Sequence, residues 1–191
     1  EENRIEYAGI IKAEATRMRT LSGKLMELIT VGEANLEWSR EEMQELFGEI
    51  GASLKVITNN RKMHFSCEAE QGSQWVDREL FKSLLYNLVD NAVKASGEDG
   101  RIQVIGYFEE GQFCIRVSDE GVGIPKEELE KITQAFYMVD KVRSRANGGA
   151  GLGLALCKEI VSLHRGTMKF ESIQGQGTRV LIRMRGGAEY A

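Results

Sequence analysis

A helical repeat of apolar and small side chains runs through residues 4 to about 30. Its members alternate between spacings of three and four positions, as do the a and d positions of roughly three heptads: Ala8, Ile11, Ala15, Met18, Ser22, Leu25 and Ile29. The pattern predicts a long amphipathic helix that packs against other helices. Because the rest of the chain has no matching repeat, we expect its partner in another subunit or in a segment outside this chain.

A second helix is predicted after a break in the pattern at residues 31–38. Residues 39–42 (Ser-Arg-Glu-Glu) fit a capping box, in which the first and fourth side chains satisfy backbone N–H groups at the start of a helix. The apolar residues that follow share one helical face: Met43, Leu46, Phe47 and Ile50.

The remaining patterns alternate between helices and short strands. Helices are predicted over residues 77–96, over 126–133 and from near Leu152, with a polar loop over 134–150. Strands are predicted over six segments: 54–57, 63–67, 101–108, 112–118, 167–172 and 178–184. Together they predict an α+β fold, a two-layer α/β sandwich in which helices cover one face of a mixed sheet, preceded by the long amphipathic helix.

Composition and charge narrow the class of protein. Lys and Arg total 25 against 29 Asp and Glu, and the net charge of −4 gives no electrostatic basis for nucleic-acid binding. No apolar run reaches the roughly 18 to 20 residues that span a bilayer. The first residues lack the basic start and apolar middle of a signal peptide. Cys67, Cys114 and Cys157 include no C-x-x-C pair, which predicts core thiols in a reducing compartment.

The helix predicted at residues 77–96 carries polar side chains that suit a metal ion and phosphates. Asn87, Asn91 and Lys94 cluster on a face separate from the apolar one. Two carboxamides one turn apart offer oxygens to a hard cation, and the ammonium offers charge to the phosphates that accompany it. The alternative for these residues alone is a solvated polar face.

A second candidate lies where the strand at 112–118 ends. Asp119 is followed by Gly121 and Gly123, which let the backbone turn sharply while the carboxylate faces a pocket. Such a carboxylate could accept a hydrogen bond from an exocyclic amine such as that of adenine. A plain turn is the alternative.

Two further segments are rich in glycine, in a chain with 21 glycines and one proline. Residues 148–154 (Gly-Gly-Ala-Gly-Leu-Gly-Leu) open a helix, and close backbone approach at a helix N-terminus suits phosphates. The segment is not a P-loop, since no Gly-Lys-Ser/Thr follows, and no strand precedes it as in a dinucleotide fingerprint. Residues 175–178 (Gly-Gln-Gly-Thr) join two strands and alone indicate only a hairpin turn.

In this order, the four segments resemble the N box and the three glycine boxes of the superfamily that joins gyrase, the large heat-shock chaperone, histidine kinases and the MutL mismatch-repair protein. Residues 88–92, 134–145 and 149–154 look like those of a sensor histidine kinase. The resemblance covers residues 39–185, and the N-terminal helix resembles the second helix of the kinase's dimerisation hairpin. It implies a partial hairpin at 1–31, a linker at 32–38 and an ATP-binding catalytic domain at 39–186.

The resemblance implies a site for ATP and Mg²⁺. Asp119 would bind the adenine amino group with support from Gly123 and Thr178, Asn87 and Asn91 would hold Mg²⁺, and Lys94 would neutralise phosphate charge. Residues 134–150 would form a lid, anchored by Phe136 and Tyr137. The other implied ATP-binding residues are Gly121, Lys141, Arg143, Arg145, Gly149, Gly151, Leu152 and Gly153.

The sequence departs from the family pattern at three places. Glu120 replaces a usual Asn, Ala150 replaces a common Thr or Ser, and Arg165 replaces a common Gly. The glycine pattern remains, but a side-chain contact between residue 150 and phosphate is not expected.

The residue at position 87 distinguishes a site for phosphoryl transfer from a site for ATP hydrolysis. Relatives that hydrolyse ATP carry Glu at this position to activate water, and Asn87 cannot act as a general base at neutral pH. The domain is therefore expected to hold ATP until an outside nucleophile arrives. In the family this is a histidine followed by an acidic residue, whereas His64 and His164 precede Phe65 and Arg165 and are interpreted as structural.

These observations predict a protein-histidine kinase that transfers the γ-phosphoryl group of MgATP to a histidine absent from this chain, so the chain itself has no catalytic residue and should not autophosphorylate. By resemblance, the parent would be a homodimer through the N-terminal helix, would pass the phosphoryl group to a response-regulator receiver domain, and would hold this domain in the cytoplasm. Its membrane anchor would lie in segments outside this chain. The alternatives are a serine kinase of the anti-sigma type and a degenerate nucleotide-binding docking module.

Overall fold

Five strands form the main sheet of the structure, a computed structural model that describes residues 2–32, 35–140 and 150–185. Their order across the sheet is β2 (His64–Ala69), β4 (Arg101–Glu109), β5 (Gln112–Asp119), β7 (Gly177–Met184) and β6 (Thr167–Ile173). β2 and β4 run parallel, whereas the other neighbours are antiparallel. The sheet is therefore mixed, as the sequence predicts.

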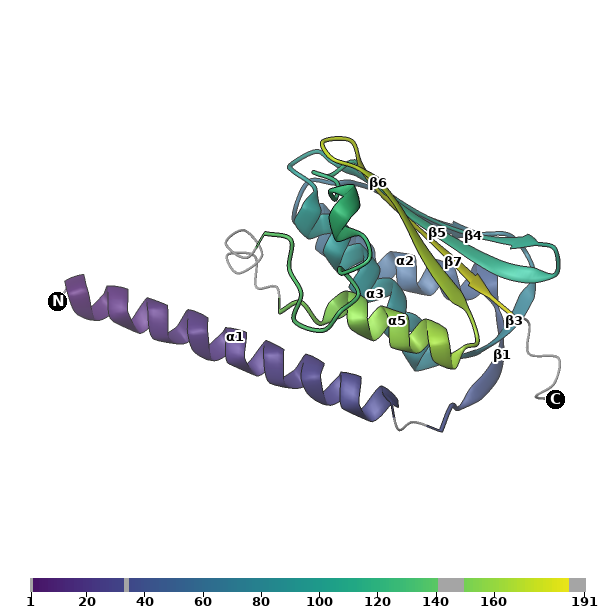
Figure 1. Ribbon diagram of the computed structural model, residues 1–191, viewed down its shortest axis with the longest axis horizontal. Coiled ribbons are helices and arrows are strands. Elements are labelled where there is room, and N and C mark those ends of the chain that lie inside the picture. The colour runs from purple at the N-terminus through teal and green to yellow at the C-terminus, as the bar shows by residue number, and fades with distance from the viewer. Residues whose placement is uncertain (1, 33–34, 141–149, 186–191) are drawn as a thin grey trace.

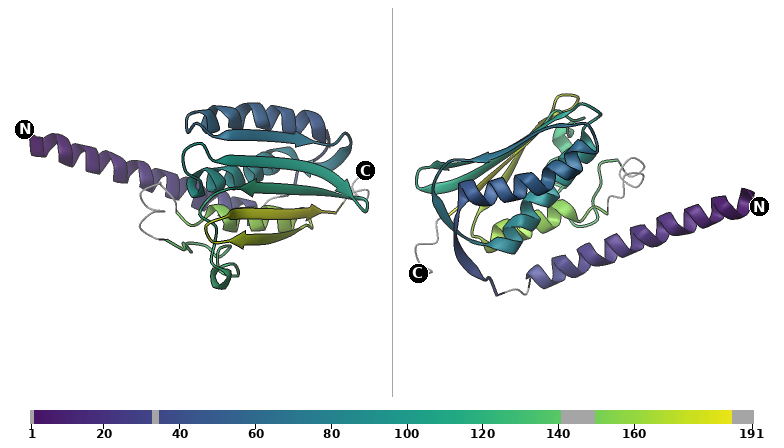
Figure 2. Two further views of the ribbon diagram at one scale, coloured as in Figure 1. Left: turned by 90° about the horizontal axis from the view of Figure 1, so that it is seen from above. Right: turned by 180° about the vertical axis from the view of Figure 1, so that it is seen from behind.

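Three helices cover one face of this sheet: α2 (Met43–Asn59), α3 (Arg78–Ala95) and α5 (Gly153–Leu163) (Figures 1 and 2). The layers meet in an aromatic cluster of Phe47, Phe81 and Phe113, whose ring centroids lie 5.8 to 6.5 Å apart. All three side chains are fully buried, so they exclude water between α2, α3 and β5. The predicted two-layer α+β sandwich is confirmed.

The N-terminal helix, α1 (Glu2–Gly32), runs away from this sandwich and touches it only toward its C-terminal end (Figure 1). There Val31 is buried and Leu28 packs against the core. Farther up the helix, Ile11 and Met18 of the predicted stripe are more than 60% exposed. The long helix is confirmed, and its stripe has no partner among the described residues. No helix within the described ranges is long and apolar enough to cross a bilayer.

Two predictions around α2 were wrong. Residues 54–57 are not a strand but the last part of α2, since the buried face that starts at Met43 continues through Leu54 to Thr58 at helical spacing. A short apolar run does not by itself distinguish strand from helix, and here the longer period decides. The capping box at 39–42 is absent as well: these residues lie in β1 (Trp38–Glu42), and Glu42 makes no side-chain cap.

Two strands were missed: β1 and the strand that pairs with it. β3 (Ser73–Asp77) pairs antiparallel with β1 as a separate two-stranded sheet. Asp77 ends this strand and also caps α3, because its side chain accepts a hydrogen bond from the Leu80 N–H at 3.0 Å. The helix predicted at 126–133 shortens to the 3₁₀ turn η1 (Lys126–Glu128).

Candidate functional site

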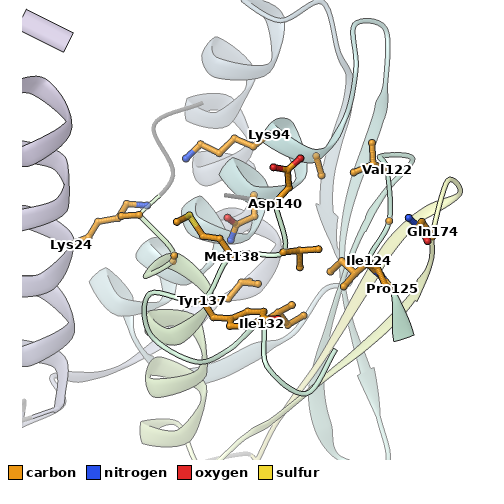
Figure 3. Close-up of a pocket in the computed structure, with 18 residues that line it drawn as sticks. Lys24, Lys94, Val122, Ile124, Pro125, Ile132, Tyr137, Met138, Asp140 and Gln174 are labelled. Carbon is orange, nitrogen blue, oxygen red and sulfur yellow. The ribbon is translucent and has the colours of Figure 1, made fainter. Parts of the chain in front are cut away.

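A cavity of about 410 Å³ opens between α3, α5, the chain after β5 and the end of α1 (Figure 3). Part of its wall is apolar, from Val122, Ile124, Pro125, Ile132 and Met138, and the labelled side chains in Figure 3 surround one space. Polar groups enter it from the helices: Lys24, Asn91 and Lys94. An apolar wall with a few converging polar groups is typical of a site for an organic ligand.

Two asparagines of α3 meet the start of α5 beside this cavity. A Cβ atom on Gly153 would lie 3.2 Å from Asn87 Oδ1 and 3.4 Å from Asn91 Nδ2, so only glycine leaves this space open. Asn87 is buried, and its Nδ2 donates to the Ser83 carbonyl oxygen at 2.9 Å. Asn91 Nδ2 is also buried but has no hydrogen-bond partner among the described residues.

The lysine of the same cluster is held in place by a carboxylate. Lys94 Nζ lies 2.6 Å from Asp90 Oδ2, one turn earlier on α3. Lys94 lines the cavity together with Asn91, whereas Asn87 is not part of the lining. The structure thus brings together the three polar residues that the sequence singled out on this helix.

Asp119 ends β5 directly opposite Thr178 of β7. Its Oδ1 accepts a hydrogen bond from the Gly121 N–H at 2.9 Å. Burial raises the pKa of this carboxyl group, against the opposing effect of the Gly121 and Thr178 backbone N–H groups. Close packing here requires glycine at 177, where φ is +110° and a Cβ atom would lie 2.0 Å from the Asp119 carbonyl oxygen.

Ser172 of β6 is a site neighbour that sequence reasoning missed. Its hydroxyl donates to the Gly177 carbonyl oxygen at 2.8 Å and lies 2.9 Å from Thr178 Oγ1. It also accepts from the Ile124 N–H at 2.8 Å. Gly123 completes this corner with a φ of +66°. Among these predicted residues, Gly123 lines the cavity, whereas Asp119, Gly121 and Thr178 lie outside its lining.

The glycine segment before α5 meets the predicted lid. The Phe136 N–H donates to the Gly151 carbonyl oxygen at 2.8 Å, and Gly151 has a φ of +69°. Tyr137 lines the cavity, but Phe136 is 56% exposed, so only Tyr137 fits the predicted role of packing anchor. Leu152 is buried with 1% exposure, so a ligand would meet its backbone rather than its side chain.

Four predicted ATP-binding residues lie outside the described residues: Lys141, Arg143, Arg145 and Gly149. The described part of the chain contains no group of three or more His, Cys, Asp or Glu side chains that could hold a metal ion.

The buried histidine has a structural role, as predicted. His164 Nε2 accepts from the Asp77 N–H at 3.0 Å, and its Nδ1 faces the Ile160 carbonyl oxygen at 2.8 Å, which fixes a neutral ring. Burial lowers the pKa of His164. His64 is exposed on β2, and the three cysteines are free thiols.

Lys24 of α1 was missed altogether. Its ammonium donates to Asn87 Oδ1 at 3.0 Å and lies 3.8 Å from Asp90 Oδ2. Nothing in the sequence signals this contact, because Lys24 lies 63 positions before Asn87 and in a different predicted segment.

Comparison with known proteins agrees with this geometry. The model of the family "Histidine kinase-, DNA gyrase B-, and HSP90-like ATPase" matches residues 76–187, more than half of the chain. The chain belongs to this family. Within it, the chain has the ATP-binding catalytic domain of sensor histidine kinases, and the predicted family is confirmed.

Individual relatives place the domain within longer proteins. The chain is 34% identical to the sensor histidine kinase WalK of Bacillus subtilis over 90% of this chain and 29% of WalK. It is 30% identical to the sensor-like histidine kinase SenX3 of Mycolicibacterium smegmatis over 90% of this chain and 46% of SenX3. It therefore spans less than half the length of these curated relatives.

Solved structures of histidine kinases share the fold. The nucleotide-free catalytic domain of histidine kinase ThkA superposes with a TM-score of 0.67 at 25% identity, over 79% of this chain and 97% of that domain. Full-length ShkA in complex with AMPPNP superposes with a TM-score of 0.80 over 97% of this chain and 39% of ShkA. At 19% identity, the likeness to ShkA concerns the fold alone, and it includes the region of α1.

Proposed function

We propose that the domain binds MgATP in the cavity beside α3 and α5 and provides the γ-phosphoryl group to a histidine on a segment outside this chain. The observation that carries the proposal is the buried Asn91 amide, whose Nδ2 has no partner in the described structure. Buried polar groups are nearly always satisfied, so such a group at a cavity indicates a ligand that completes it.

The asparagine pair fits a hard cation. Asn87 Oδ1 and the Asn91 amide converge on the space that Gly153 leaves open. A half-turn of the Asn91 amide exchanges its oxygen and nitrogen, so its oxygen can face the same space. Mg²⁺ prefers oxygen ligands and usually binds with few protein groups together with substrate phosphates. A bound Mg²⁺ would neutralise phosphate charge, and Lys94 would add to this from the cavity wall.

The other end of the site suits a purine. The Asp119 carboxylate retains unused lone pairs after it accepts the Gly121 N–H, and it would accept the adenine amino group. Gly123 would let the base approach the backbone, and Thr178 would support it beside Ser172. Gly151, Gly153 and the backbone of Leu152 would face the phosphates, together with Gly149, Lys141, Arg143 and Arg145.

The residues around the metal end favour transfer over hydrolysis. Position 87 carries an amide rather than a carboxylate, and the nearby Asp90 carboxylate is paired with Lys94 at 2.6 Å. No free carboxylate of the described part of α3 is therefore available as a base for water. The nucleophile would have to arrive from outside, as expected for an acceptor histidine.

The parent protein would contribute the rest of a two-component system. Residues 1–31 would be the second helix of a dimerisation hairpin, with a linker at 32–38 and the catalytic domain at 39–186. The exposed stripe of α1 supports a homodimer through this helix. Histidine kinase ThkA has been solved in complex with the response regulator protein TrrA, and that kinase superposes on 97% of this chain with a TM-score of 0.75. A receiver domain is the corresponding partner, and a membrane anchor would lie in segments outside this chain.

Calorimetry and a transfer assay test the proposal. Titration with ATP, ADP and a non-hydrolysable analogue, each with Mg²⁺, should show binding at or below millimolar concentration, and no binding of any of them would contradict it in favour of a docking module. With radiolabelled ATP and a supplied histidine-bearing hairpin, we expect acid-labile phosphohistidine. Acid-stable label on a serine substrate would instead support a kinase of the anti-sigma type.

A further inference from the structure

Two side chains of α1, one helical turn apart, clasp the polar face of α3 at the cavity. Lys24 donates to Asn87 Oδ1 at 3.0 Å, and Glu27 accepts a hydrogen bond from the Ser83 hydroxyl. Figure 3 shows Lys24 reaching from α1 toward the cavity, on the same side as Lys94. The clasp joins the helix that the family model leaves out to the asparagine that the proposed function assigns to the metal ion.

The clasp fixes the orientation of the Asn87 amide. Its Nδ2 donates to the Ser83 carbonyl oxygen at 2.9 Å and lies 3.4 Å from the Ser83 hydroxyl. Its Oδ1 is therefore the atom left to face the open space, and Lys24 binds that atom. The Lys24 side chain is 25% exposed, so this contact is partly shielded from water.

We infer that Lys24 competes with the nucleotide's metal ion for Asn87 Oδ1, so that the α1 clasp and binding of the metal–nucleotide complex exclude each other at this atom. The inference rests on the proposed function. A hydrogen-bonded ammonium and Mg²⁺ at its usual oxygen distance of about 2.1 Å would place two cations around one amide oxygen, where they repel each other. Asp90, which lies 3.8 Å from Lys24, is already paired with Lys94 and offers little to offset that repulsion.

The competition couples the position of α1 to the nucleotide. By linkage, the Lys24–Asn87 contact weakens binding of the metal–nucleotide complex by the same free energy by which that complex weakens the contact. The packing of Leu28 and Val31 against the core does not involve the asparagine, so α1 would loosen around Lys24 without leaving the domain.

Removal of the charge at Lys24 tests the inference, because competition with the metal ion and binding of a phosphate predict opposite changes in nucleotide affinity. Lys24→Met keeps the aliphatic stem and removes the charge. If Lys24 competes with the metal ion, the variant binds the magnesium complex of a non-hydrolysable ATP analogue about fivefold more tightly or better, within the usual range of coupling between sites. If Lys24 is instead a phosphate ligand, the variant binds it more weakly.

The full 191-residue chain is used throughout, with Lys12→Met as a matched control. Lys12 is exposed on the same helix, and its loss changes the net charge by the same amount. Calorimetric titrations are run with Mg²⁺ and with EDTA. We expect tighter binding by Lys24→Met only with Mg²⁺ and no change for the control. Unchanged or weaker binding of the magnesium complex, or an equal gain in EDTA, would overturn the inference.

Hydrogen exchange gives a readout that does not depend on affinity. Without nucleotide, Lys24→Met should exchange faster than the wild type at the amides around residues 24–28. The wild type should show the same loosening when the magnesium complex is added but not with ATP in EDTA. Unchanged or slower exchange with bound magnesium complex would contradict the inference while leaving the proposed function intact. Failure of the wild type to bind any nucleotide would remove the proposed function and the inference with it.

Discussion

Substitution of Asp119 by Asn offers a sharp test of the adenine end of the site. The carboxylate already accepts the Gly121 N–H at 2.9 Å, and Asn keeps an oxygen for that bond. The second oxygen becomes an NH₂ group. An adenine amino group would then face a donor instead of an acceptor, in a place already partly shielded from water.

The size of the effect follows from the loss of one acceptor. An unsatisfied donor at a partly buried position costs about 1 to 3 kcal/mol, which corresponds to a loss of about 5- to 150-fold in affinity.

The stability of the nucleotide-free protein should not decrease with the same substitution. Burial raises the pKa of Asp119, so its contribution to stability is present below its unfolded pKa and is lost as the pH rises through its folded pKa. At neutral pH the ionised carboxylate therefore costs stability, and the Asn variant should melt at the same temperature or slightly higher.

Calorimetry with MgATP measures the affinity, and thermal melting without nucleotide measures the stability. Glu120→Gln is the matched control, because it removes the neighbouring carboxylate, which is exposed and lies 4.0 Å from Arg101. We expect the control to bind ATP normally. Equal ATP affinity in Asp119→Asn and in the wild type would remove Asp119 from the site. An equal loss of ATP affinity in Glu120→Gln would show that the effect comes from the change in net charge alone.

Three further changes test other parts of the structure. Asn91→Ala should weaken Mg-nucleotide binding about ten- to a hundredfold. It should not lower the melting temperature of the nucleotide-free protein, because the buried Nδ2 has no described partner to lose. A clear drop in that temperature would contradict this prediction. Gly177→Ala should destabilise the protein by more than Gly175→Ala in urea unfolding. Both glycines have a positive φ, which costs about 1 to 2 kcal/mol for Ala. Only at residue 177 would a Cβ atom also meet backbone, 2.0 Å from the Asp119 carbonyl oxygen. An equal loss of stability in the two variants would refute this reasoning. Burial lowers the pKa of His164, so the unfolded chain takes up the proton before the folded chain does as the pH decreases. The melting temperature should therefore decrease as the pH is lowered through about 6.5, and His164→Gln should flatten this dependence.

The sequence predicted those features that depend on local pattern. The faces of α3 were legible because Phe81, Leu85 and Val89 repeat at helical spacing and are buried, while Asn91 and Lys94 fall on the other side. The turn after β5 was legible because Asp119 ends a clearly alternating strand.

The features that the sequence did not predict depend on pairings between distant segments. β3 is recognisable only through its register with β1, in which Trp38 lies opposite Asp77. Lys24 had no signal because its contact depends on the angle at which α1 meets the domain. Ser172 looks like any polar strand residue until β7 places Thr178 beside it.

The placement of Lys24 also bears on where a nucleophile could approach. On the proposed arrangement, the adenine lies near Asp119, at the end of β5, and the phosphates lie toward the asparagines and Gly153. The helix α1 reaches the site at the phosphate end, through Lys24 and Glu27, and not at the adenine end. Because position 87 provides no base, phosphoryl transfer depends on an acceptor brought to that same end. A contact between α1 and Asn87 is therefore well placed to link the position of this helix to the nucleotide that the acceptor would meet.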